Sequence, residues 1–142
     1  MNALLMQTIR RRIALSNEEG EVLCRYFEPR TIKKKDLLFR EGDIARDVAF
    51  VCNGVLRVYA LDDQGHDWTL QFAPTDWWVT DLASFIKQEP AHWKVEALEN
   101  SEVLLLSREN QLKLFEELPQ MESYFRVLTE NALVAQQQRL QD

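Results

Sequence analysis

Asp81 opens a short segment whose residue types could do chemistry. It directly precedes the apolar run Leu82–Phe85, and a loop and a strand follow up to Leu98. A short helix of this kind presents backbone N–H groups that can bind an anion such as a phosphate, which an arginine usually neutralises. The stretch from Thr75 to Leu98 nevertheless contains no glycine and no arginine. We therefore expect the outline of a ligand pocket without its usual cationic anchor.

The other reactive residue types argue against catalysis. The two histidines, His66 and His92, are 26 residues apart, so the closely spaced pair of a metal-dependent cupin-type enzyme is missing. Cys24 and Cys52 alone cannot hold a zinc ion or an iron–sulfur cluster, and both lie in apolar runs that predict buried, reduced thiols. No G-x-S-x-G, P-loop or G-x-G-x-x-G motif occurs. The sequence thus predicts neither an enzyme nor a metal site.

The chain has the size and composition of one globular domain. It contains 142 residues, of which 46% are hydrophobic and 28% charged. Its net charge of −6 does not favour nucleic acid, so we interpret the basic triplets Arg10–Arg12 and Lys33–Lys35 as solvated surface. The apolar run at the N-terminus is too short and too interrupted for a signal peptide or a membrane-spanning helix, and we expect a cytoplasmic protein.

Helical patterns occur at both ends of the chain. Apolar residues spaced by about four predict a first helix near the N-terminus. Ser16 and Glu19 form a capping box for a second helix over 17–27. Two more helices are expected over 108–116 and 120–141. The last one carries apolar residues in a heptad seam, which predicts packing on its own domain at the start and dimerisation further along. The seam consists of Met121, Phe125, Leu128, Ala132 and Ala135.

Between these helices the apolar residues follow a period of two, which predicts strands. Asn53–Gly54 predicts a two-residue hairpin, and Asp62–Gly65 predicts a second turn. Trp68 is expected in the core, and only one of Trp77 and Trp78 can face the core, because neighbours on a strand point to opposite faces. Such short strands with frequent turns indicate a β-barrel or β-sandwich. The expected strands are 31–32, 36–40, 48–52, 55–59, 68–72, 95–98 and 103–106.

Three motifs, in this order, resemble those of the Crp/Fnr transcription regulators of bacteria. Phe39–Asp43 (FREGD) is similar to the turn after the family's second strand, and Val51–Tyr59 (VCNGVLRVY) to its glycine-containing strand pair. Glu96–Leu104 (EALENSEVL) is similar to a later strand pair. The resemblance implies a mainly β fold, a double-stranded β-helix jelly roll of the cyclic-nucleotide-binding-domain type, with N-terminal helices and a long C-terminal helix. It also implies a β-roll domain over 1–118, a dimerisation helix over 119–142, and a DNA-binding helix-turn-helix beyond residue 142.

The same resemblance identifies the candidate pocket. In nucleotide-binding members of the family, the motif G-E-L-A-L is followed by the motif R-[ST]-A. The arginine of the second motif contacts the cyclic phosphate, and the glutamate of the first contacts the ribose. Here Thr80 and Asp81 replace the glycine and the glutamate, while Ala91 and His92 replace the arginine and its neighbouring hydroxyl residue. Charge-assisted bonds to a phosphate contribute about 1.5–3 kcal/mol each, so their loss argues against cyclic AMP. Asp81 could also act simply as a helix N-cap. The implied pocket residues are Trp78, Val79, Thr80, Asp81, Leu82, Ala91, His92 and Trp93.

The resemblance implies an effector-sensing domain of a Crp/Fnr-like regulator that does not bind cyclic AMP in the usual way. Its pocket would be filled by its own tryptophans or adapted to an unknown small effector, with no cofactor. It would form a homodimer and reach DNA only through a domain outside this chain, with no role for a membrane. The alternative is a stand-alone dimerising module for protein interactions that has lost ligand binding.

Overall fold

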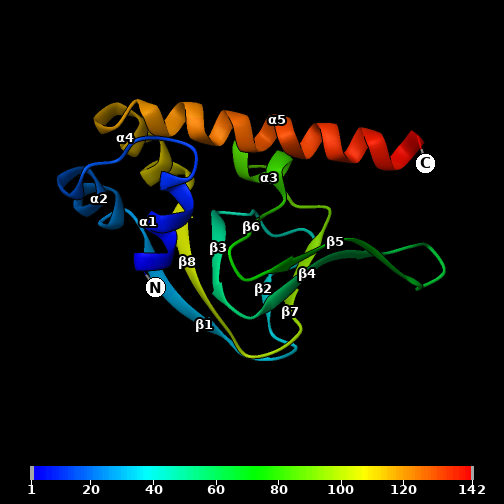
Figure 1. Cartoon of the computed structure of the whole chain (residues 1–142). Helices are drawn as coiled ribbons and strands as arrows, with labels where there is room; N and C mark the ends of the chain where they lie inside the picture. Colours follow the sequence, from blue (N-terminus) through cyan, green and yellow to red (C-terminus); the bar gives the residue numbers. More distant parts are fainter. Residues whose placement is uncertain (1, 142) are drawn as a thin grey trace.

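The computed structural model describes the main chain of residues 2–141 and the side chains of residues 2–139. Figure 1 shows strands forming a roll, with helices gathered around one side of it. This confirms the predicted class, a mainly β jelly roll with N-terminal helices and a long C-terminal helix. The helices are α1 (Asn2–Arg10), α2 (Asn17–Cys24), α3 (Leu82–Lys87), α4 (Arg108–Glu117) and α5 (Gln120–Gln141).

The strands alternate between two antiparallel sheets. One sheet has the order β1-β8-β3-β6 and the other the order β2-β7-β4-β5, so most successive strands cross from one sheet to the other. Their inner faces supply the core, which includes the fully buried Phe50, Leu56 and Val95. The strands are β1 (Glu28–Ile32), β2 (Leu37–Phe39), β3 (Asp47–Asn53), β4 (Val55–Leu61), β5 (Asp67–Pro74), β6 (Trp78–Val79), β7 (Lys94–Ala97) and β8 (Ser101–Ser107).

The predicted hairpin at Asn53–Gly54 is wrong. The strands on either side of it, β3 and β4, belong to different sheets, and Gly54 forms the corner between them. Gly54 has a φ of +123°, and a Cβ placed there would lie 2.2 Å from Ser101 Oγ. Glycine is therefore required by a close approach to Ser101 and by the backbone conformation, rather than by a two-residue turn. The true hairpin joins β4 to β5 through the predicted Asp62–Gly65 turn.

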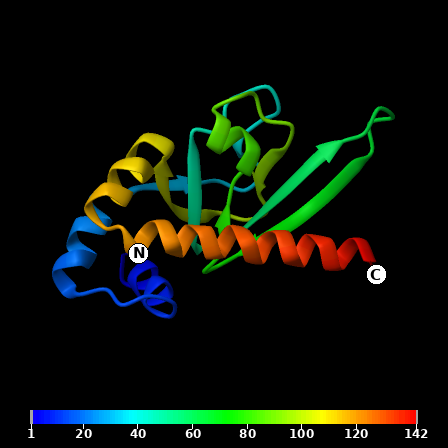
Figure 2. The same ribbon diagram turned by 90° about the horizontal axis from the view of Figure 1, so that it is seen from above.

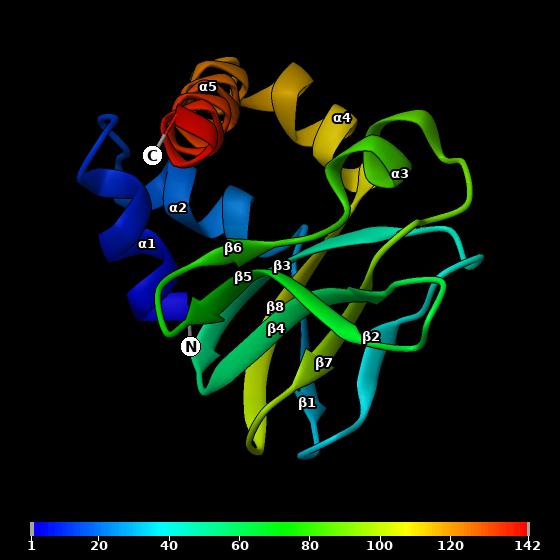
Figure 3. The same cartoon turned by 90° about the vertical axis from the view of Figure 1, so that its right-hand side faces the viewer.

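The helices pack on one side of the roll, as Figure 3 shows. The predicted capping box of α2 is confirmed, since Ser16 Oγ accepts from Glu19 N and Glu19 accepts from Ser16 N. Helix α5 crosses the molecule, and Figure 2 shows its second half running out alongside the β4–β5 hairpin. Tyr124, at its start, is buried at 1% exposure. None of the helices within residues 2–141 combines the length and the apolar character that crossing a bilayer requires.

We expect Gly54→Ala to lower the free energy of unfolding by about 2–3 kcal/mol, because it adds a steric clash to an unfavourable φ. Gly65→Ala is the matched control. Gly65 also has a positive φ of +82°, but no atom lies within 4 Å of a Cβ added there. Its expected loss is about 1 kcal/mol. Urea denaturation measures both, and equal losses for the two variants would contradict the close contact with Ser101.

Candidate functional site

Asp81 organises the segment that the sequence singles out. It is the N-cap of α3, and its Oδ1 accepts a hydrogen bond from Ser84 N at 3.2 Å. Its Oδ2 accepts from His92 N at 3.0 Å and from Trp93 N at 3.3 Å, on the segment that follows the helix. The side chain is buried, with 6% of the residue exposed. Both carboxylate oxygens are thus occupied by the protein's own main chain, and the predicted N-cap role is confirmed.

A second set of contacts ties this segment to the turn between β2 and β3. Ser84 Oγ accepts from Ala45 N at 2.9 Å and donates to Glu89 O. Gln88 adopts a left-handed conformation at the C-cap of α3, with φ of +55°, and its Nε2 donates to Phe85 O at 2.6 Å. We call residues 80–93 the cassette. Its geometry is fixed by hydrogen bonds within the chain and requires no ligand.

The position where a phosphate-binding arginine would stand is apolar. Ala91 is 4% exposed and belongs to the hydrophobic core, where its N–H donates to Asp43 O at 2.7 Å. His92 is exposed, whereas Trp93 is half-buried. The ring of Trp93 lies 5.7 Å from that of Trp68, measured between centroids. A pair of indole rings therefore packs directly after the site of the missing cation.

Trp68 does not lie in the core as predicted, because 65% of it is exposed. It belongs to β5, which is an edge strand, at the end of that strand next to the β4–β5 turn. Figure 1 shows this hairpin projecting beyond the rest of the roll, so few elements can cover its side chains. Strand alternation alone cannot reveal how far a hairpin extends from the core.

Trp78 and Val79 lie on β6, immediately before the cassette. The Trp78 ring packs among aromatic side chains, with centroids 5.0 Å from Phe50 and 5.0 Å from Phe125. Its Nε1 donates to Tyr124 Oη at 3.0 Å, and burial raises the pKa of the Tyr124 hydroxyl. The strand that leads into the cassette, β6, is therefore linked directly to α5. Trp77 is 50% exposed, which confirms that only one of the two neighbours enters the core.

The structure brings several predicted pocket residues together through hydrogen bonds. Asp81, His92 and Trp93 meet through the hydrogen bonds of the Asp81 carboxylate. Thr80 Oγ1 donates to Asp47 O at 3.0 Å, whereas Leu82 is 40% exposed. Cavities of about 330 Å³ and about 310 Å³ open elsewhere on the described surface, between β1 and β2 and along the β4–β5 hairpin. None of the eight predicted pocket residues lines either of them.

Ser84 and Gln88, which help to hold the cassette, carry no signal in the sequence strong enough to predict their roles. Ser84 stands three residues after a possible N-cap, where its backbone N–H is the expected partner, but nothing indicates its side-chain contacts. Gln88 occupies a left-handed position where glycine or asparagine is the usual residue. The sequence likewise gives no sign of the hydrogen bond to the Tyr124 hydroxyl, because its partner Trp78 is distant along the chain.

The five seam residues of α5 occupy different environments. Met121 is fully buried, and Phe125 and Leu128 pack against the core. Ala132 and Ala135 are exposed, in the half of the helix that extends from the roll. Large apolar side chains are exposed in the same half, with Leu133 at 59% and Val134 at 53%. The first half of the seam thus belongs to the domain's own core, whereas the apolar residues of the second half are exposed. The second half still contacts β5, where Arg139 donates to Leu70 O at 3.5 Å.

Replacing Asp81 tests whether its carboxylate is structural. Asp81→Ala leaves three backbone N–H groups without their acceptor in a buried place, so we expect a loss of about 2–4 kcal/mol in the free energy of unfolding. Asp63→Ala, at an exposed position in the β4–β5 turn, is the control and should change stability by less than about 0.5 kcal/mol. Urea denaturation measures both. Unchanged stability in Asp81→Ala would mean that the carboxylate is free for another role.

Comparison with known proteins agrees with the β-roll fold. The model of the cyclic nucleotide-binding domain family matches residues 29–118. No curated protein matches the chain. Among solved structures, catabolite activator protein from Thermus thermophilus superimposes with a TM-score of 0.81 at 22% identity, over 94% of this chain and 61% of that one. This chain therefore spans about three-fifths of the length of that protein.

Two further structures share the fold. The sensor domain of the transcriptional regulator DNR from Pseudomonas aeruginosa has a TM-score of 0.76 at 16% identity, over 99% of this chain and 91% of that one. The c-di-GMP-responsive global regulator CLP from Xanthomonas campestris has a TM-score of 0.70 at 19% identity, over 83% and 59% of the two chains. At such identities these likenesses establish the fold alone. Together with the family model, which matches more than half of the residues, they show that this chain belongs to the cyclic nucleotide-binding domain family.

Proposed function

We propose that this chain is the effector-sensing domain of a Crp/Fnr-like transcription regulator and that it does not bind cyclic AMP in the usual way. Residues 1–118 are the β-roll with its N-terminal helices, and residues 119–142 are a dimerisation helix. A helix-turn-helix beyond residue 142 would contact DNA. The likeness in fold to a catabolite activator protein and to the sensor domain of DNR supports this arrangement.

The observation that carries the proposal is a folded cassette without the phosphate-binding arginine. Both oxygens of the Asp81 carboxylate accept from main-chain N–H groups, and the buried Ala91 stands at the place of the arginine. A cyclic phosphate entering here would lose its hydration and meet a carboxylate without a compensating positive charge. An effector, if one binds, is therefore uncharged or weakly polar, and it would have to displace the Trp68–Trp93 pair or rearrange the cassette.

The link between the cassette and α5 supports a sensing role. Trp78 lies two residues before Thr80 and donates its indole N–H to Tyr124 on α5. A rearrangement of the cassette would therefore change the packing of α5, the helix that leads towards the proposed DNA-binding domain. A ligand can shift such an equilibrium only by as much as its affinity differs between the two arrangements.

The alternative function is a stand-alone dimerising module for protein interactions that has lost ligand binding. The closed cassette and the exposed apolar residues of α5 are consistent with it. Reading the gene beyond codon 142 separates the two functions. A helix-turn-helix pattern there supports the regulator, and an immediate stop codon supports the module.

We expect cyclic AMP to leave the melting temperature of the purified domain unchanged, because no cation is placed to neutralise its phosphate. A ligand at one hundred times its Kd stabilises a protein by about 2.7 kcal/mol, which shifts the melting temperature of a domain of this size by several degrees. The measurement is a thermal-shift series with cyclic AMP and with uncharged metabolites, and a cyclic-AMP-binding relative serves as the positive control. A shift of several degrees at micromolar cyclic AMP would overturn the proposed pocket.

We also propose that the second half of α5 forms a homodimer. Ala135→Glu places a charge in the second half of the seam, at an exposed position, so sedimentation equilibrium should show a dissociation constant raised by about tenfold or more. Ser123→Glu is the matched control, since it adds the same charge at an exposed position on the first half of the helix. A wild-type domain that stays monomeric at high concentration, or equal effects of the two variants, would contradict this interface.

A further inference from the structure

The positive charge of this acidic chain is concentrated at one place in the fold. Residues 30–40 contain five basic residues and one acidic residue, a local net charge of +4. The remainder has 12 basic and 22 acidic residues, a net charge of −10, so this segment stands out from an acidic background. We call residues 30–40 the basic corner. It comprises the end of β1, the turn after it, and β2 up to Arg40.

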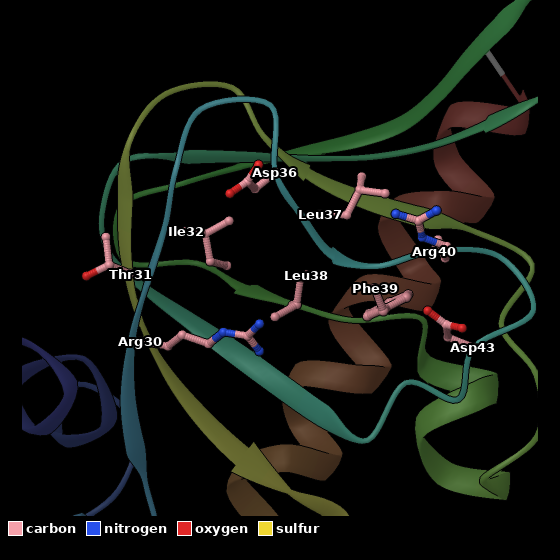
Figure 4. Close-up of a pocket in the computed structure, with 9 residues that line it drawn as sticks. All are labelled: Arg30, Thr31, Ile32, Asp36, Leu37, Leu38, Phe39, Arg40 and Asp43. Atoms are coloured by element: carbon pink, nitrogen blue, oxygen red, sulfur yellow. The ribbon is translucent and has the colours of Figure 1, made fainter.

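The basic corner lines an open cavity of about 330 Å³. Figure 4 shows Arg30 reaching from β1 across the opening towards Leu38, while Arg40 and Asp43 lie at the other end of the cavity. Asp36 also lines it. Within the described residues, neither Arg30 nor Arg40 has an ion-pair partner. Two guanidinium groups and two carboxylates therefore surround one solvent-filled opening.

Both strands at the opening are edge strands. β1 pairs only with β8, and β2 pairs only with β7, so each has backbone groups with no partner strand. An edge of this kind can accept the main chain of an extended peptide. The lysines next to the edge disfavour pairing with a basic strand and attract an acidic one. Charge therefore favours an acidic segment as the partner.

The turn that carries the three lysines is held in a fixed conformation. Lys34 N donates to Asn100 Oδ1 at 2.9 Å, and Lys35 N donates to Ala97 O at 2.7 Å. All three lysine side chains are exposed. A surface whose main chain is already ordered loses little conformational entropy when a partner binds.

We propose that the basic corner is a docking surface for an extended acidic segment of a partner protein. Such a segment offers carboxylates to Arg30 and Arg40 and backbone N–H donors to Asp36 and Asp43. The phosphate groups of a nucleic acid or of a lipid are acceptors that carry negative charge, so the two aspartates would repel them, and so would the net charge of −10 on the rest of the chain. The mixed lining of the cavity therefore favours a peptide over a nucleic acid or an anionic lipid surface.

The basic corner lies at the end of the roll remote from α5, as Figures 1 and 3 both show. A partner bound there would leave the second half of α5 exposed. The docking surface is thus separate from the proposed dimer interface on α5.

The test measures binding of a labelled peptide of about twelve residues, long enough in extended form to cross the corner, with glutamate alternating with valine or threonine. We expect saturable binding by fluorescence anisotropy, at least about tenfold weaker when glutamine replaces glutamate. Arg30→Ala/Arg40→Ala should weaken binding by a similar factor. The matched control, Arg25→Ala/Lys113→Ala, removes two exposed positive charges from elsewhere and should change affinity less than about twofold.

Three results would overturn the proposal. One is no binding of the acidic peptide at about 1 mM, the usual limit of weak association. Another is equal loss of affinity in the two double variants, which would indicate bulk electrostatics. The third is tighter binding of an oligothymidylate of equal length, or of phosphatidylglycerol vesicles, than of the peptide. Amide chemical shifts that change at residues 30–40 on addition of the peptide, and not on α5, would support the assigned surface.

Discussion

The cassette depends on one buried carboxylate. Asp81 begins α3 and also receives the main chain of His92 and Trp93, so a single side chain fixes both ends of the segment. A buried carboxylate is tolerated only when its lone pairs are satisfied, and three N–H donors achieve this without an external cation. Since the donors come from the chain itself, the segment folds in the absence of a ligand. The same arrangement already engages both Asp81 oxygens, which would otherwise be available to a sugar hydroxyl.

Trp78 connects the cassette to the rest of the molecule. Its ring fills the space between the sheet of β3 and β6 and the start of α5, and its N–H bonds to the buried hydroxyl of Tyr124. The cassette, the roll and α5 therefore share one packed region. Beyond that region α5 leaves the roll, and its apolar residues remain exposed within the described part of the chain. The contacts of the seam with the core end at Leu128.

Local signals in the sequence were sufficient for the helices, most strands, the capping box at Ser16 and the N-cap at Asp81, because each depends on neighbours close in the chain. The features that the sequence did not predict depend on contacts between residues far apart in the chain. The sequence around Gly54 predicted a hairpin, but the role of this glycine depends on Ser101 of β8, which is distant along the chain. Trp68 looked like a core residue, since its exposure depends on how far the hairpin projects.

The contact between Trp78 and Tyr124 also has an optical consequence. An indole whose N–H is bonded within an apolar region emits at shorter wavelength than one in water, and Trp68 and Trp77 are at least half exposed. The emission of this domain therefore includes a blue component from Trp78, one of its four tryptophans, which reports the packing of α5. A change in that helix would appear as a red shift of the blue component, without any added label.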